Sequence, residues 1–237
     1  MENKITLVLI RHPETEGNVV TNSEMSKLER PNHLFRPTEK GMVQIDRAIT
    51  TYAELGLNMP IFVMHSTALR TKVLASRLGA IYGIVGRPLV EDSRLNEKWD
   101  GIFHSLTTEE ISARYPEQID LREKQGWYHH KPFGGESGPD VEVRIRSLLQ
   151  ELGSVPTHLG KTIVLCSHGN WQFLFEKIAL GQSASLTEIA RETRPIPNCA
   201  ISVYEFFPQN PFEQQVKLTH INRYAPWLAE NEPVRYV

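Results

Sequence analysis

The segment from Leu7 to Asn18, LVLIRHPETEGN, begins with an apolar run and changes abruptly to charged and polar residues. A short apolar run of this kind is typical of a strand buried in a helix-covered sheet. Arg11 and His12 then fall where the strand ends and side chains open toward solvent, which is where open α/β sheets bind their ligands. The segment therefore predicts an α/β fold and marks one edge of its sheet as the functional one.

The rest of the chain continues an alternation of strands and helices. Residues 38–55 have apolar side chains at helical spacing, the run Ile61–Met64 predicts a strand, and a helix follows from about Ala68 to Leu78, with Ser66 or Thr67 as its N-cap. Helical spacing returns over residues 141–152. KTIVLCSHGN then repeats the opening pattern, a strand that ends on histidine, before a helix from Asn170 onward. AISVYEF and QQVKLTHI alternate weakly and predict a closing antiparallel pair.

This order predicts a three-layer α/β sandwich with a mostly parallel central sheet and helices on both faces. The stretch from about 95 to 139 lacks clear periodicity and contains Trp99, Trp127 and several Gly and Pro residues. We expect it to be an inserted cap or lid on a single domain that spans residues 1–237.

Composition excludes several classes of protein. With 237 residues, 40% of them hydrophobic, and a net charge of −2, the chain can bury a full core and offers no basic stripe for nucleic acid. The apolar start, Ile5–Ile10, is too short for a signal-peptide core or a membrane span, so we expect a cytoplasmic protein with no membrane partner. Cys166 and Cys199 lack metal-ligand spacing and are expected to be small buried residues.

Two predicted strands end on histidine, and a parallel sheet carries His12 and His168 to the same edge. A single histidine of this kind is as often structural as functional, but the pair favours a site. Neither histidine has a partner at HxH or HExxH spacing, and Arg11 repels a metal ion. A guanidinium beside an imidazole suits a phosphate, which it binds through parallel hydrogen bonds. We expect a phosphate site with neither metal nor cofactor.

An ordered set of motifs, spanning roughly residues 5 to 206, resembles the histidine phosphatase superfamily of phosphoglycerate-mutase-like proteins, in particular its phosphatase branch. The motifs, in chain order, are RHPETEGN, TEKG, STALRT, RLNEKWDG, GGES and CSHGN. The resemblance implies an α/β sandwich and metal-free phosphoryl transfer through a phosphohistidine.

The resemblance also implies individual roles. His12 corresponds to the nucleophile and Glu97 to the general acid and base, although Glu91, Asp92 and Asp100 lie close enough in sequence to compete for the second role. The groups expected around the transferring phosphoryl group are Arg11, Arg70 and His168, with Asn18 and Gly169 as further substrate-binding residues.

Pro13 departs from the family pattern, in which glycine usually follows the nucleophile. Proline fixes φ and removes a backbone N–H, so any phosphate contact made by that amide is lost. We expect altered phosphate binding. A hypothesis from another class is a catalytically weak regulatory protein that binds a phosphate ligand without turnover.

Within the family, the run NEKWDGIFHSLTTEEISARYPEQ resembles the phosphatases more than the mutases, which require further basic residues for a bisphosphate. We therefore expect hydrolysis of a small phosphorylated metabolite. A 2,3-bisphosphoglycerate-dependent phosphoglycerate mutase is the alternative, since Asn170 in HGN is shared with mutases. The sequence leaves the substrate and the oligomeric state open, a homodimer included. Residues 224–237 are expected to dock on their own domain or on a second chain.

Overall fold

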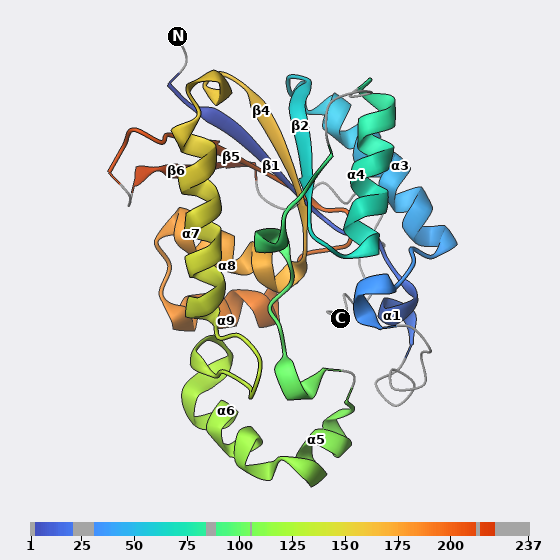
Figure 1. Cartoon of the computed structure of the whole chain (residues 1–237), viewed down its shortest axis with the longest axis vertical. Helices are drawn as coiled ribbons and strands as arrows, with labels where there is room; N and C mark the ends of the chain where they lie inside the picture. Colours follow the sequence, from blue (N-terminus) through green and yellow to red (C-terminus); the bar gives the residue numbers. More distant parts are fainter. Residues whose placement is uncertain (1–2, 21–30, 84–88, 105, 212–213, 221–237) are drawn as a thin grey trace.

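The fold is built on one mixed sheet. The computed structural model describes residues 3–20, 31–83, 89–104, 106–211 and 214–220. In this part of the chain the sheet has six strands in the order β3-β2-β4-β1-β5-β6 (Figure 1). The strands are β1 Ile5–Arg11, β2 Pro60–His65, β3 Val90–Glu91, β4 Thr162–Ser167, β5 Ile201–Phe206 and β6 Val216–His220.

Strand directions follow the predicted pattern. β1 is parallel to β4, β4 to β2 and β2 to β3, whereas β5 runs antiparallel to β1 and β6 antiparallel to β5. In the register of β1 and β4, Arg11 lies opposite Ser167. The next residues, His12 and His168, therefore leave adjacent strands at the same level, which confirms the expected meeting of the two strand ends.

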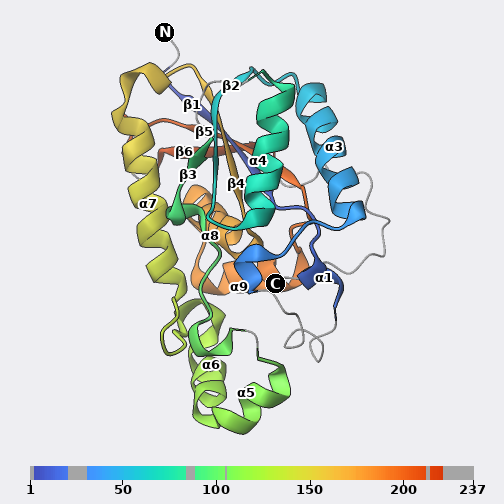
Figure 2. The ribbon, with the colours of Figure 1, turned by 45° about the vertical axis from the view of Figure 1, so that its right-hand side comes forward.

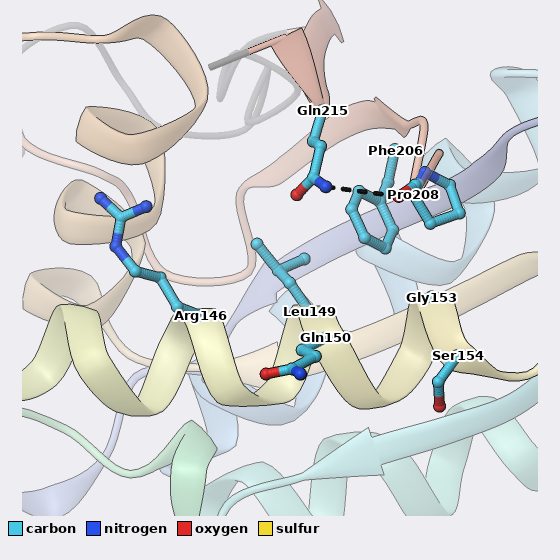
Figure 3. Close-up of a pocket in the computed structure, with 8 residues that line it drawn as sticks. All are labelled: Arg146, Leu149, Gln150, Gly153, Ser154, Phe206, Pro208 and Gln215. Carbon is cyan, nitrogen blue, oxygen red and sulfur yellow. Dashed lines mark hydrogen bonds between the residues drawn. The ribbon is translucent and has the colours of Figure 1, made fainter. Parts of the chain in front are cut away.

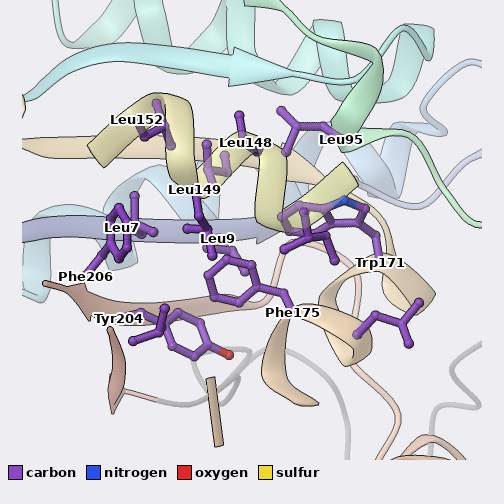
Figure 4. Packing of buried hydrophobic residues seen from close by; sticks show 14 of the residues in the cluster. Leu7, Leu9, Leu95, Leu148, Leu149, Leu152, Trp171, Phe175, Tyr204 and Phe206 are labelled. Atoms are coloured by element: carbon purple, nitrogen blue, oxygen red, sulfur yellow. The ribbon is translucent and has the colours of Figure 1, made fainter. Parts of the chain in front are cut away.

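Alternating residues of β1 divide the core into two layers. Leu7 and Leu9 belong to a cluster with side chains of α7 (Gly138–Ser154) and α8 (Gly169–Leu180), shown in Figure 4. Val8 and Ile10 pack on the opposite face with α3 (Glu39–Glu54) and α4 (Leu69–Ile81). Both faces of the sheet are thus covered (Figure 2), as the continuous apolar run predicts.

Other described helices are α1 (Glu16–Val19), α5 (Thr108–Arg114), α6 (Pro116–His129) and α9 (Ala184–Thr193). α5 and α6 project from the main body on the side away from the N-terminus (Figures 1 and 2). The stretch that lacked clear periodicity therefore contains two helices, and α6 bends at Gly126, where φ is 75°. None of the described helices is long and apolar enough to cross a membrane.

Two expectations about small residues have different outcomes. Cys166 and Cys199 are fully buried as predicted, and burial raises the pKa of both thiols, which disfavours the reactive thiolate. The predicted capping of α4 by Ser66 or Thr67 is wrong. The N-cap is Ala68, whose side chain has no group that could make a capping bond. The Ser66 hydroxyl is instead hydrogen-bonded to His168.

Candidate active site

The site is formed where β1 and β4 end side by side. The rings of His12 and His168 have centroids 5.2 Å apart, and each residue is only 1% exposed. Parallel pairing of the two strands causes this proximity, so the sequence-predicted pair is brought together.

Backbone groups orient His12. Its Nδ1 lies 2.7 Å from the carbonyl oxygen of Pro13, so Nδ1 carries the proton and Nε2 keeps its lone pair. Its own carbonyl accepts a hydrogen bond from Asn198 Nδ2 at 2.9 Å, and its amide donates to the carbonyl of Ser167 at 3.0 Å. The ring nitrogen that faces away from Pro13 is therefore Nε2.

The surroundings of His12 favour the neutral imidazole. Burial, followed by the charges of Arg70 and Arg11, holds the pKa of His12 well below its ordinary value. A neutral ring is what a nucleophile requires, because the attacking atom needs an unprotonated lone pair.

His168 is held in the opposite way. Arg70 Nη2 lies 3.2 Å from His168 Nδ1, and because a guanidinium only donates, Nδ1 is an acceptor. Nε2 then donates to Ser66 Oγ at 2.8 Å. The Ser66 hydroxyl donates a hydrogen bond to Thr71 Oγ1, also at 2.8 Å. The Thr71 hydroxyl in turn donates to the carbonyl of Ala68. This chain of donors fixes the proton of neutral His168 on Nε2.

Two buried arginines border the histidines. Arg11 donates from Nη1 to the carbonyl of Ile196, and Arg70 Nη1 donates to the carbonyl and side-chain oxygens of Asn32 at 2.8 and 2.9 Å. Nε of Arg70 is buried without a hydrogen-bond partner among the described residues. Burial also lowers the pKa of Arg70 to about 10. An anion would relieve both costs, since a buried cation needs a compensating charge.

Glu97 sits at the start of α8. Its Oε1 accepts from the amides of Lys98 and Trp171 at 2.9 and 3.0 Å, and its Oε2 accepts from the amide of Asn170 at 3.1 Å. These donors lower the pKa of Glu97, but burial outweighs them and raises it above its ordinary value. A raised pKa suits a group that must hold a proton before the reaction.

The competing carboxyl groups have other surroundings. Asp92 forms an ion pair with Arg94 at 2.6 Å, and that contact, with hydrogen bonds from Arg94, lowers its pKa although burial acts in the other direction. Glu91 is exposed on β3. Asp100 borders the same pocket as Glu97 but is largely exposed to solvent. Glu97 is thus the candidate whose environment favours the protonated form.

Arg144 and Glu136, which the sequence analysis did not identify, hold the segment around Glu97 in place. Arg144 of α7 donates to the carbonyls of Arg94 and Glu97 at 2.7 and 3.2 Å. It also forms two hydrogen bonds with Glu136, which accepts from the amide of Trp99 at 3.0 Å. Glu136 belongs to the GGES motif, which was the sequence signal that could have pointed to it. No sequence motif pointed to Arg144.

The site borders a pocket of about 290 Å³, whose lining includes neither His12 nor Arg11. Arg70, Glu97 and His168 form part of its lining. The remaining lining residues are Asn32, His33, Thr67, Ala68, Asn96, Lys98, Trp99, Asp100 and His104.

Asn18 and Gly169 stay predictions as substrate-binding residues. The side-chain oxygen of Asn18 accepts from the amide and hydroxyl of Thr15, both at 2.9 Å, so the amide nitrogen is directed away from Thr15. Gly169 is the first residue of α8, where backbone N–H groups favour anions. Among the described residues, no group of three or more His, Cys, Asp or Glu side chains is arranged to hold a metal ion.

A second pocket, of about 420 Å³, is drawn in Figure 3. It lies at the end of the sheet where β1 begins. It is bordered by α7 residues such as Leu149 and by Phe206, which pairs with Ile5 at the start of β1. This pocket is remote from the strand ends that carry the two histidines. The chemistry of the site therefore concerns only the smaller pocket.

A strand-end histidine pair between buried arginines is suited to bind a phosphate, and the comparison with family models points to the same chemistry. The model of the histidine phosphatase superfamily (branch 1) matches residues 7–219. The chain belongs to this superfamily, as the motifs indicated.

Relatives include phosphatases and mutases. Glucosyl-3-phosphoglycerate phosphatase of Mycobacterium tuberculosis H37Rv is 31% identical over 170 residues, 69% of this chain and 70% of the relative. The 2,3-bisphosphoglycerate-dependent phosphoglycerate mutase of Rhizobium etli is 28% identical over 174 residues, 70% of this chain and 75% of the relative. The family and the phosphatase relatives identify the protein as an enzyme of the phosphatase type.

Solved structures share the fold. "Mycobacterial hydrolase 1" aligns with a TM-score of 0.72 and 23% identity over 92% of this chain and 98% of that structure. The native structure of a mycobacterial glucosyl-3-phosphoglycerate phosphatase aligns with a TM-score of 0.69 and 21% identity over the same shares. The predicted α/β sandwich is confirmed.

Proposed function

We propose that the protein hydrolyses phosphomonoesters of small metabolites through a phosphohistidine on His12, with Glu97 as general acid and base. The observation that carries the proposal is the orientation of His12. Its Nδ1 is held by the Pro13 carbonyl at 2.7 Å, and the ring lies against His168 among buried arginines. This leaves a neutral Nε2 at the place where an anion would be bound.

In the first step, the Nε2 lone pair of His12 attacks phosphorus and forms an N–P bond. The P–O bond to the leaving alcohol breaks, and Glu97 donates its proton to the departing oxygen. Arg11 and Arg70 stabilise the charge on the other phosphoryl oxygens. Donors fixed before the reaction are typically worth about 3 kcal/mol each in the transition state.

In the second step, the Glu97 carboxylate removes a proton from water, whose oxygen attacks phosphorus. The N–P bond breaks and its electron pair returns to Nε2 of His12. Inorganic phosphate is released, and Glu97 is again protonated for the next cycle. Atoms, charge and protons balance with no group beyond the substrate and water.

His168 takes part by changing its protonation. Its Nδ1 accepts from Arg70 in the structure and so has no proton to offer a phosphoryl oxygen. Burial and the charges of Arg70 and Arg11 hold the pKa of His168 low, and a bound phosphate offsets those charges. A substrate that binds as the monoanion would draw Arg70 to it and pass its P–OH proton to Nδ1, while Nε2–H stays hydrogen-bonded to Ser66. His168 then donates to the substrate as an imidazolium. The proton leaves with the released phosphate, so the count is unchanged.

A labelled phosphomonoester, supplied with a metal chelator and quenched in alkali, tests the mechanism. We expect an acid-labile phosphoryl adduct on His12 and steady release of phosphate. The adduct should be missing in His12→Ala. An adduct on another residue, or turnover lost to the chelator alone, rules the mechanism out. Phosphate affinity without any adduct would instead indicate the regulatory protein.

Mutase activity is the second candidate, because phosphoglycerate mutases are among the relatives. One assay separates the two: 3-phosphoglycerate is supplied with and without 2,3-bisphosphoglycerate, and isomer and free phosphate are both measured. We expect free phosphate in both conditions. Isomerisation that requires the bisphosphate would replace hydrolysis as the activity.

A further inference from the structure

The TEKG motif and the glutamine that follows it, Gln44, take no part in the proposed mechanism, yet they contact the segment that carries the nucleophile. Gln44 lies on α3 and is 3% exposed. Its side-chain oxygen accepts a hydrogen bond from the backbone N–H of Glu14 at 2.8 Å. That N–H belongs to the peptide group between Pro13 and Glu14, whose carbonyl oxygen lies 2.7 Å from His12 Nδ1. Gln44 and the His12 ring thus bind the two ends of one peptide group.

This peptide group transmits the position of Gln44 to the ring. It is planar and trans, so its carbonyl and its N–H point in opposite directions and turn together. A hydrogen bond that fixes the N–H on Gln44 therefore also fixes the direction in which the Pro13 carbonyl faces His12. The two hydrogen bonds polarise each other, which increases the negative charge on the carbonyl oxygen and favours the proton on Nδ1.

The start of α3 is held close to Glu14 by several contacts. The backbone N–H of Thr38 donates to the carbonyl of Glu14 at 3.1 Å, and its hydroxyl donates to the Glu14 carboxylate at 2.8 Å. Lys40 forms an ion pair with the same carboxylate at 3.5 Å. A Cβ atom at Gly41 would collide with the Glu14 carbonyl oxygen, so any side chain there would push the helix away. Gln44 lies three residues further on the same helix face, which brings its side chain to the Glu14 amide.

We infer that Gln44 is a positioning residue for the nucleophile: it holds the peptide group after Pro13, and this group keeps the His12 ring in the Nδ1–H form with Nε2 free to attack. The kinetic consequence rests on the proposed function, whereas the tautomer does not. Without the acceptor on Gln44, the Glu14 N–H lacks its hydrogen-bond partner and the peptide group turns toward another. The Pro13 carbonyl then leaves Nδ1, and part of the His12 population moves its proton to Nε2.

¹⁵N NMR of the free protein measures this tautomer, because protonated and unprotonated ring nitrogens give well-separated signals. We expect wild-type His12 to be the Nδ1–H tautomer. Gln44→Met keeps the length of the side chain without its acceptor and should move about half of His12 to the Nε2–H form. The single-turnover rate of phosphohistidine formation should fall about fivefold. The affinity for inorganic phosphate, measured by calorimetry, should change less than about twofold, since the arginines that bind it are untouched.

Two variants serve as controls. Gln44→Glu restores an acceptor oxygen at the same length, so it should keep the Nδ1–H tautomer and stay within about threefold of the wild-type rate. Gln118→Met makes the same chemical change at a glutamine of α6 that is 1% exposed, and it should alter neither the tautomer nor the rate. If Gln44→Met does not fold, Gln44→Asn, whose amide stops one carbon short of Glu14, takes its place with the same expectations.

Gln44 has no positioning role if Gln44→Met leaves the His12 tautomer unchanged, or if Gln118→Met or Gln44→Glu shifts it as far. The role is also overturned if the tautomer shifts while phosphohistidine forms at the wild-type rate. Failure of the proposed function has a different signature. No phosphohistidine then forms on His12 even in the wild type, while the NMR criteria still decide whether Gln44 orients the ring.

Discussion

The ends of β1 and β4 look alike in sequence, but the histidine at each end is held by a hydrogen bond to a different ring nitrogen. His12 is anchored through Nδ1 by the carbonyl of the next residue, whereas His168 is anchored through Nε2 by the hydroxyl of Ser66. The same residue type on two parallel strands therefore presents Nε2 at one end and Nδ1 at the other. The neighbour that occupies one nitrogen decides what the other can do.

Strand order explains the difference. β4 lies between β2 and β1, so the chain that leaves β2 places Ser66 beside His168. β1 has β5 on its other side, and the turn before β5 supplies Asn198 to the carbonyl of His12. The His12 ring is anchored by the carbonyl of the next residue, Pro13. We infer that topology prepares one end for attack and the other for donation.

Removing each ring in turn should show the difference between the two strand ends most strongly. His12→Ala eliminates the nucleophile and should lower kcat by at least about 10⁴-fold. His168→Ala removes one donor and should cost about 10²- to 10³-fold. Steady-state kinetics with an alkyl phosphate measure both.

The alkali-stable phosphoryl adduct separates the two roles further. It should be lost in His12→Ala and still form, slowly, in His168→Ala. Equal losses in both variants, with no adduct in either, would contradict the division of roles.

Glu97 belongs to the β4 end, because its carboxylate is bound by the first amides of α8. Glu97→Gln removes the transferable proton and should lower kcat/KM, which reports formation of the phosphohistidine, by about 10²- to 10⁴-fold for alkyl phosphates. The loss should be much smaller for aryl phosphates, since their leaving groups need no proton. Wild-type kcat/KM should fall as pH rises through the raised pKa of Glu97, and this limb should vanish in the variant. Equal losses on both substrate types would move the acid role to Asp100.

Much of the fold could be predicted because its strands are short apolar runs that end abruptly. Leu7–Ile10 and the run before His168 gave the parallel pair, and the periodicity of residues 38–55 and 141–152 gave a helix for each face. α9 escaped prediction, since only Thr187 among its residues is buried and its apolar Leu186 and Ile189 are exposed. The helices α5 and α6 were obscured because their described residues are mostly exposed.

Candidate site residues could be predicted where they directly follow a recognisable strand, as Arg11 and His12 do. It was not predictable where support comes from distant elements. Ser66 was taken for a helix cap because its local sequence allows one, and Arg144 and Asn198 reach the site through packing alone. The segment 21–30, within the stretch 19–37 whose role the sequence left open, and residues 224–237 lie outside the described residues.

Ser66 tests the β4 end on its own. Ser66→Ala deprives His168 of the acceptor that fixes its tautomer and should lower kcat about tenfold, with a changed pH profile. The double variant with His168→Ala should be no slower than His168→Ala alone, because Ser66 acts only through that ring. Additive losses would show that Ser66 merely supports the fold.

Pro13 tests the β1 end, with the smallest expected effect. Pro13→Gly keeps the carbonyl that binds His12 Nδ1, so kcat should change less than about threefold. The new backbone N–H should tighten binding of inorganic phosphate by about twofold to fivefold, measured by calorimetry. The freer chain should also lower the free energy of unfolding by about 1 kcal/mol. A tenfold fall in kcat would instead mean that the proline ring, and not only its carbonyl, holds the nucleophile in place.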